Sequence, residues 1–161
     1  MGELAIEIRA SQNRTDRFDT AVCELLGINR SDNTALDVLD RHERMTAGEL
    51  ARELRLTTGA VTALIDRLEK AGYVRRVADP TDRRRVLVEV TPLTRQITEL
   101  IYGPIAREYQ RLARRYSLED LELILDFMRS GNAMEDWRQA RLAEQAPEVR
   151  RLARRPQRDS D

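Results

Sequence analysis

Residues 46–91 contain the stretch that decides the fold: TAGELARELRLTTGAVTALIDRLEKAGYVRRVADPTDRRRVLVEVT. Thr46 and Glu49 have the spacing of a capping box, in which a hydroxyl and a carboxylate satisfy backbone amides in the first turn of a helix. Leu50, Ala51 and Leu54 then share one helix face. The pattern predicts a short amphipathic helix that begins directly after Thr46.

A second helix is predicted after Thr57, because threonine is a favoured N-cap residue. Its apolar residues recur at helical spacing, which predicts a buried stripe made of Val61, Leu64, Ile65 and Leu68. The stripe leaves the opposite face to solvent, and that face carries Thr58, Gly59, Thr62, Ala63, Asp66 and Arg67. Gly72 is predicted to end the helix in the left-handed conformation.

Two runs of β-branched and aromatic residues follow, at 73–77 and 86–90. Valines alternate with other residues in the second run, which is typical of a half-buried strand. Asp79-Pro80 marks a turn between the runs, so they predict a β-hairpin. Helix, turn, helix and hairpin together indicate a winged helix-turn-helix, whose second helix suits the major groove of DNA while the hairpin reaches the backbone or minor groove.

The hairpin is rich in arginine. Five guanidinium groups lie within eleven residues, at Arg75, Arg76, Arg83, Arg84 and Arg85. Guanidinium groups on an exposed ribbon bind phosphates well and can enter a narrow, electronegative minor groove. The predicted DNA contacts are therefore Thr57, Thr58, Gly59, Thr62, Ala63 and Arg67 from the helix, with Arg76, Asp82, Arg83, Arg84 and Arg85 from the wing.

These motifs resemble the DNA-binding lobe of the MarR family, the multiple-antibiotic-resistance type of bacterial transcription regulators. The resemblance is carried by TAGELA, TGAVTxLIDRLExxGYV and DPxDRR, and it extends more weakly over roughly residues 10–143. It implies that Arg84 enters the minor groove as partner of Asp82, and that Asp66 and Arg67 form an acidic-basic pair late in the recognition helix. The sequence departs from the family at Ala63, where many relatives have arginine or another long polar residue. A bidentate guanine contact worth about 1–3 kcal/mol of discrimination is then missing, although alanine can touch a thymine methyl group.

The rest of the chain predicts helices, because 35% of its residues are charged and only 4% are aromatic. We expect a mainly α fold with a small β-hairpin wing, in which helices from both chain ends form a dimerisation region. The predicted organisation is a single MarR-like domain over 1–145, with the DNA-binding lobe at 30–91 and dimerisation helices at 1–29 and 92–145. Residues 146–161 are predicted to be a basic, disordered tail. A monomeric helical core is the alternative to the homodimer, which the resemblance also implies.

Charge is informative through its position. Residues 1–45 carry 6 basic and 9 acidic side chains, residues 46–91 carry 9 and 7, and residues 92–161 carry 13 and 12, so the whole chain is neutral. A neutral protein does not coat nucleic acid through its overall field. Binding is therefore expected to depend on the local arginine cluster and on groove geometry.

The sequence lacks the motifs of several functional classes. There is no apolar run that could span a membrane and no signal-peptide core, so a cytoplasmic location is expected. Cys23 and His42 are the only cysteine and histidine, too few for a disulfide framework or a usual zinc site. No phosphate-binding loop or nucleophile elbow is present, and we expect neither an enzyme nor a cofactor. Cys23 is interpreted as a packed bystander, and His42 as a helix-terminus residue.

The sequence thus predicts a transcriptional regulator, in particular a ligand-responsive repressor that binds a pseudo-palindromic operator as a homodimer. Its expected partners are double-stranded DNA, a second copy of itself and a phenolic or lipophilic small molecule. Two alternatives stay open, a constitutive or architectural DNA-binding protein and a winged-helix module for protein–protein interaction. The sequence assigns no residue to an effector pocket.

Overall fold

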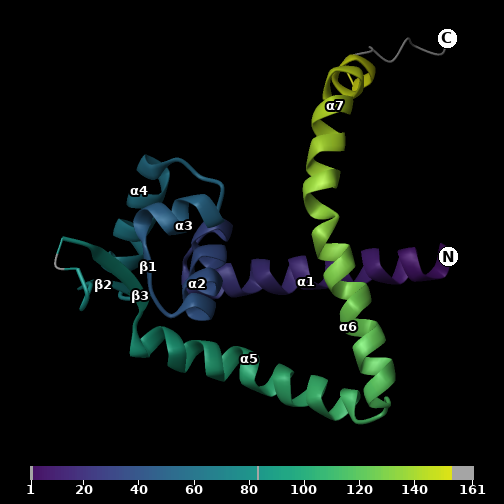
Figure 1. Ribbon diagram of the computed structural model, residues 1–161, viewed down its shortest axis with the longest axis horizontal. Helices are drawn as coiled ribbons and strands as arrows, with labels where there is room; N and C mark the ends of the chain where they lie inside the picture. The colour runs from purple at the N-terminus through teal and green to yellow at the C-terminus, as the bar shows by residue number, and fades with distance from the viewer. Residues whose placement is uncertain (1, 83, 154–161) are drawn as a thin grey trace. The chain divides into compact units, whose positions relative to one another are not determined.

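The computed structural model describes residues 2–82 and 84–153 (Figure 1). Its elements are α1 (Gly2–Leu26), α2 (Arg30–His42), β1 (Met45–Thr46), α3 (Ala47–Glu53), α4 (Thr58–Lys70), β2 (Val74–Ala78), β3 (Val86–Val90), α5 (Pro92–Ala113), α6 (Leu118–Ala133) and α7 (Glu135–Ala153). The chain divides into two units, Met1–Pro104 and Ile105–Asp161. The mainly helical fold with a small β-wing is confirmed.

The ends of α3 and α4 follow from the sequence as predicted. The hydroxyl of Thr46 accepts the amide of Glu49 at 3.2 Å, and the Glu49 carboxylate accepts the amide of Thr46 at 2.7 Å. Thr57 caps α4, since its hydroxyl accepts the amide of Ala60 at 3.3 Å. Gly72 follows α4 with a φ of 81°, the left-handed conformation that glycine adopts without a steric penalty.

The sheet has three strands in the order β1-β3-β2, all antiparallel, where the sequence predicted two. The missed strand, β1, is two residues long, and Thr46 within it also caps α3. Met45 pairs with Val88 and Thr46 with Leu87. So short a segment has no period-two pattern, and therefore sequence periodicity cannot predict it.

The core of the Met1–Pro104 unit lies between the sheet and α2, α3 and α4, which gather beside it in Figure 1. The predicted stripe of α4 is confirmed, because each of its four residues is at most 1% exposed. These side chains pack with residues from every other element of the lobe: Ala35, Leu36, Val38, Leu39, Met45, Leu50, Ala51, Val74, Val88 and Val90. Their packing fixes which face of α4 remains outside.

The N-terminal helices are α1 and α2. The helix α1 starts at Gly2. The N-cap of α2 is Asn29. The side chain of Asn29 accepts the amide of Asp32 at 2.9 Å, and the Asp32 carboxylate accepts the amide of Asn29 at 3.3 Å. This reciprocal pair is stronger than a serine cap with no such partner.

The C-terminal helices α5 and α6 begin at local start signals. Pro92 opens α5, which continues through Pro104 as one helix. Ser117 and Asp120 form the capping box of α6. The helix α7 continues through Pro147 to Ala153, so the prediction of a disordered tail was wrong for residues 146–153; residues 154–161 lie outside the described range. Over residues 2–82 and 84–153, no helix combines the length and the apolar character that a membrane crossing requires.

Candidate nucleic-acid interface

The first half of the solvent face of α4 carries small side chains. Thr58, Gly59, Thr62 and Ala63 are all exposed, opposite the buried stripe. The Thr62 hydroxyl donates to the carbonyl of Thr58 at 2.9 Å. A Cβ built on Gly59 meets no atom within 4 Å, so nothing within the protein requires glycine there. This face can approach a flat or concave partner closely.

Arg67, at the end of that face, pairs with a buried carboxylate. One of its guanidinium nitrogens lies 2.7 Å from Asp32, whose side chain is 5% exposed. Because Asp32 also belongs to the capping box of α2, this ion pair joins the start of α2 to the recognition helix. The Arg67 side chain as a whole is 51% exposed to solvent.

Arg76 on β2 is held by two carboxylates of α4. It donates to Asp66 at 2.6 Å and forms a close ion pair with Glu69. The hydrogen bond that Arg76 donates to Asp66 is the main reason that the pKa of Arg76 is raised. Arg76 therefore joins the wing to the recognition helix, and its positive charge is compensated within the protein. This contact gives the acidic residue late in α4 a structural role.

The wing begins with a side-chain turn. The carboxylate of Asp79 is buried and accepts the amide and the hydroxyl of Thr81, at 2.8 and 2.7 Å, and the amide of Asp82 at 3.3 Å. The bonds from Thr81 hold the pKa of Asp79 below its usual value. Arg85 lies at the other side, 3.3 Å from Glu49 and 3.7 Å from Asp79. The base of the loop is thus closed by hydrogen bonds and by charge.

Arg84 differs from the other wing arginines. Its backbone amide donates to the Asp82 carboxylate at 3.0 Å, so Asp82 shapes the turn and acts on Arg84 through its backbone. The side chain is exposed, and within residues 2–82 and 84–153 it forms no ion pair. Arg83, also predicted as a contact, lies outside the described residues. Arg84 thus presents a positive charge that the described part of the protein does not neutralise.

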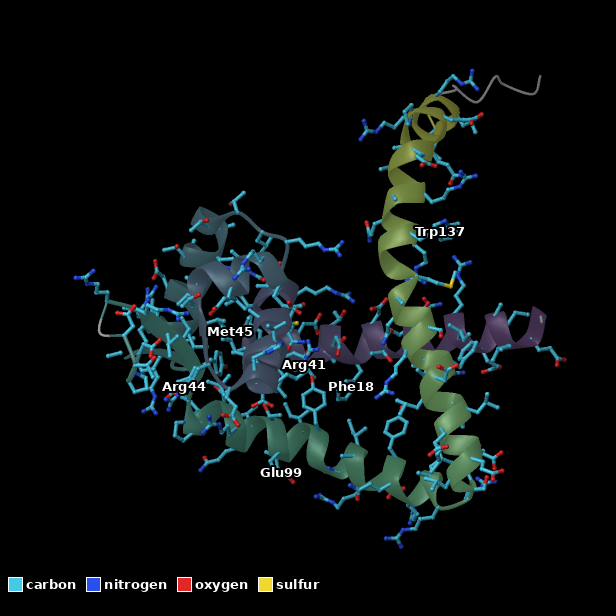
Figure 2. All side chains as sticks on the ribbon, in the orientation of Figure 1. Phe18, Arg41, Arg44, Met45, Glu99 and Trp137 are labelled. Carbon is cyan, nitrogen blue, oxygen red and sulfur yellow. The ribbon has the colours of Figure 1, made fainter. Side chains whose placement is uncertain are left out.

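Glu89 is a buried acid that sequence reasoning missed. It lies on β3 opposite Arg75 and is 2% exposed. Arg75 donates to its carboxylate at 2.7 Å, and Arg44 reaches it at 2.6 Å from the segment between α2 and β1 (Figure 2). Burial raises the pKa of Glu89, but the hydrogen bonds from Arg75 and Arg44 outweigh this and leave the pKa lowered. The hairpin register could have predicted Arg75 as a partner, but not Arg44.

The Met1–Pro104 unit also contains a cavity of about 460 Å³ between α1, α2 and the first half of α5. Tyr73 lines it and directly follows Gly72 at the end of the recognition helix. The Tyr73 hydroxyl donates to the carbonyl of Leu26 at 2.9 Å, and the Thr94 hydroxyl donates to the carbonyl of Tyr73 at 2.6 Å. One cavity residue therefore connects α1, α5 and the end of α4.

The remaining candidates carry little chemistry. Cys23 is buried, and desolvation, with Asp19 next in importance, raises the pKa of its thiol. A thiol held in its neutral form is a poor nucleophile. Among the side chains that the structure describes, no group of three histidine, cysteine, aspartate or glutamate residues could hold a metal ion.

A winged helix with an exposed recognition face and a cationic wing defines a DNA-binding transcriptional regulator. Residues 26–85 match the sequence pattern of the MarR family. The chain is 41% identical over 124 residues to YcgE, an uncharacterized HTH-type transcriptional regulator of Bacillus subtilis, covering 76% of this chain and 80% of YcgE. The protein belongs to the MarR family.

Solved structures agree on the fold. A mutant of MepR from S. aureus superposes with a TM-score of 0.65 at 20% identity, over 81% of this chain and 95% of that one. A mutant of MarR from E. coli, complexed with operator DNA, gives a TM-score of 0.52 at 24% identity, over 79% and 91% of the two chains. The fold described above is thus one that is known in a complex with DNA.

Proposed function

We propose that the protein is a homodimeric, ligand-responsive repressor that inserts α4 into the major groove of its operator and the wing into the adjacent minor groove. The observation that carries the proposal is that one lobe presents two exposed features. These are the face of α4 with small side chains and the guanidinium of Arg84, which no described carboxylate neutralises. The first fits the floor of a groove, and the second fits a narrow groove with a high negative potential.

Within this interface the predicted contacts divide into two kinds. Thr57, Thr58, Gly59, Thr62 and Ala63 meet bases or phosphates directly, and Arg84 enters the minor groove. Arg67, Arg76 and Arg85 are already paired with carboxylates. They contact DNA only through the N–H groups that these partners leave open, and their larger contribution is to hold α4 and the wing in register.

The proposal of a dimer is supported by α6. Among its described side chains none is buried, although the helix carries large apolar residues that are 45–73% exposed: Leu118, Leu123, Ile124, Leu125, Phe127 and Met128. Exposed apolar area of this extent calls for a partner. A second copy of the chain is the partner that a palindromic operator requires, with recognition helices about 34–36 Å apart.

The effector site proposed for ligand response is the cavity beside Tyr73. A ligand there contacts the residue that joins the end of α4 to α1 and α5. Binding can then favour one orientation of the recognition helix over another, provided that the ligand prefers the cavity shape of one state. Phenolic and lipophilic molecules are the expected class.

The test is selection of bound fragments from the genome that encodes the protein, followed by titration of the best fragment at several salt concentrations. A specific dimer should select an inverted repeat, and the logarithm of its binding constant should fall linearly with the logarithm of the salt concentration. A library of lipophilic compounds should contain at least one that weakens binding. Absence of any salt-dependent shift would contradict DNA binding through this face. Specific binding that no compound alters would instead identify a constitutive DNA-binding protein.

A further inference from the structure

The cavity between α1, α2 and α5 has one apolar side. Its wall is formed by aliphatic side chains from all three helices: Val22, Leu26, Leu36, Ile97 and Ile101. A ligand that fills it must therefore present an apolar body, because burial against such a wall is driven by removal of apolar surface from water.

The polar side of the cavity is acidic. Asp19 projects from α1, and Asp37 and Asp40 lie three residues apart on α2. No lysine or arginine is among the described residues that line the cavity. The charged groups that line the cavity are therefore all negative, and they favour a ligand that carries a positive charge.

Neighbouring arginines leave two of these three carboxylates without an ion pair among the described residues. Arg41 pairs with Asp37 at 3.0 Å, and the guanidinium of Arg30 pairs with Asp16. Asp19 and Asp40 form no ion pair within the described ranges 2–82 and 84–153. Two of the three lining carboxylates are therefore available to a ligand.

Tyr102 lines the cavity, and the pKa of its phenol responds to the negative charges there. Burial, together with the negative charges of Asp19 and Asp37, raises the pKa of its phenol. Its ring meets Phe18 edge to face, with centroids 5.8 Å apart, and Phe18 extends from α1 in Figure 2. The negative charges of Asp19 and Asp37 that act on this phenol favour a cation in the cavity and oppose an anion.

We propose that this cavity selects organic cations with an apolar body over phenolates and carboxylates of the same size. This inference rests on the effector role proposed above and narrows the effector's chemical class. The cationic centre lies against Asp19 and Asp40, and the apolar body lies on the aliphatic wall. An anion placed there loses part of its hydration and is repelled by the lining carboxylates, and no lysine or arginine among the described lining residues compensates it.

Tetraphenylphosphonium and tetraphenylborate are suitable probes, because they have nearly the same shape and opposite charges. Calorimetric titration of the full-length protein should show that the phosphonium binds at least about tenfold more tightly than the borate. The double variant Asp19→Asn/Asp40→Asn should lose about tenfold in phosphonium affinity, on the scale of two partly exposed ion pairs. Glu53→Gln removes an exposed charge from α3, outside the cavity, and should bind as the native protein does.

A charge reversal keeps the test independent of folding defects. Asp19→Lys/Asp40→Lys should bind the borate more tightly than the phosphonium, a gain that a misfolded protein cannot show. The phosphonium should also weaken operator binding by the native protein. If the native protein binds the borate or salicylate as tightly as the phosphonium, the charge selectivity is wrong while ligand response stands. If no probe binds and none changes operator affinity, both proposals fail.

Discussion

Ala63 is the residue whose position tests the orientation of the recognition helix. It is exposed, whereas the next residue, Leu64, is 1% exposed in the core. Ala63→Arg should therefore fold normally and gain affinity for operators with guanine opposite this position. Leu64→Arg buries an unpaired charge and should destabilise the lobe by several kcal/mol, about 4 or more.

Thermal melts of the two variants and selection from a random operator pool provide the comparison. The native protein serves as the reference for both stability and sequence preference. If Ala63→Arg melts as low as Leu64→Arg, the rotation of α4 is wrong, and the proposed contacts of Thr58 and Thr62 are wrong with it.

Arg84 is expected to make the largest single contribution of the wing to operator affinity. Arg84→Ala should weaken binding by about 1–3 kcal/mol, because a charge-assisted contact in a desolvated groove is lost. Fluorescence anisotropy at fixed salt measures the change, and Arg114→Ala, which removes an exposed arginine after α5, is the matched control. Native-like affinity of Arg84→Ala would remove the wing from the mechanism.

For single residues, the sequence predicted which side chains of α4 are exposed, but it did not predict the ion-pair partners of the arginines. The period of the α4 stripe predicted which residues face outward, since helical geometry fixes both faces together. The partners of Arg67 and Arg85 are Asp32 and Glu49, 35 and 36 residues earlier in the chain. Only the packing of α2 and α3 against the lobe brings these groups together, and no local pattern encodes it.

Three helices of the Met1–Pro104 unit end in the same hydrogen-bonded motif, with a left-handed residue after the helix. Gly27 and Gly72 occupy this position after α1 and α4, but Arg55 occupies it after α3, with a φ of 53°. The amide of Arg55 donates to the carbonyl of Arg52, and that of Leu56 to Ala51, as the motif requires.

Arg55→Gly should therefore stabilise the protein by about 0.5–1 kcal/mol, because the left-handed conformation costs a residue with a Cβ more than it costs glycine. Urea denaturation measures the change. Arg52→Gly, within α3 at ordinary helical angles, is the control and should destabilise by about 1 kcal/mol. A loss of stability in Arg55→Gly would mean that the arginine side chain contributes more than its backbone strain costs.

Glu89 connects β3 to β2 and to the segment before β1. Its ionisation should make the free energy of unfolding depend on pH. Its pKa is lowered from the ordinary value of 4.5, with burial opposed by Arg75 and Arg44. A carboxyl group with a lowered folded-state pKa contributes stability above the unfolded value and loses it as the pH falls through the folded value. Glu89→Gln should thus be less stable by about 1–2 kcal/mol at pH 7.

The free energies of unfolding of Glu89→Gln and the native protein should converge as the pH falls through the lowered folded-state pKa of Glu89. Unfolding curves at pH 7 and pH 3 test this, with Glu53→Gln as the control for an exposed carboxylate. A stability difference that is the same at both pH values would assign the loss to packing and not to ionisation.

Among the elements, caps and stripes were predictable while the shortest and the most polar segments were not. Thr46 and Thr57 were predicted as caps because each cap is a local hydrogen-bond pattern. The strand β1 was not predicted because it forms only through pairing with β3. The second half of α7 was missed because Pro147 and its arginines read as a break, although helices can contain an internal proline.

At the scale of the whole molecule, the unit Ile105–Asp161 presents apolar side chains that the chain itself leaves exposed. Trp137, labelled in Figure 2, is 61% exposed, and Leu142 on the same helix is equally so. A solvent-exposed tryptophan among leucines and methionines is costly for an isolated monomer. The proposed dimer removes this surface from water and supplies the second recognition helix that an inverted repeat needs.

Deleting residues 118–161 should therefore convert the dimer to monomers or aggregates and abolish specific operator binding. Each half-site alone offers too few contacts, whereas two linked half-sites bind with a high effective concentration. Multi-angle light scattering and an operator titration measure the two effects, and deletion of residues 154–161 alone, which leaves α6 and α7 in place, is the control. The winged lobe should keep its melting transition in both variants, because its core lies entirely before residue 91. An intact dimer in the longer deletion would show that α6 and α7 do not form the interface.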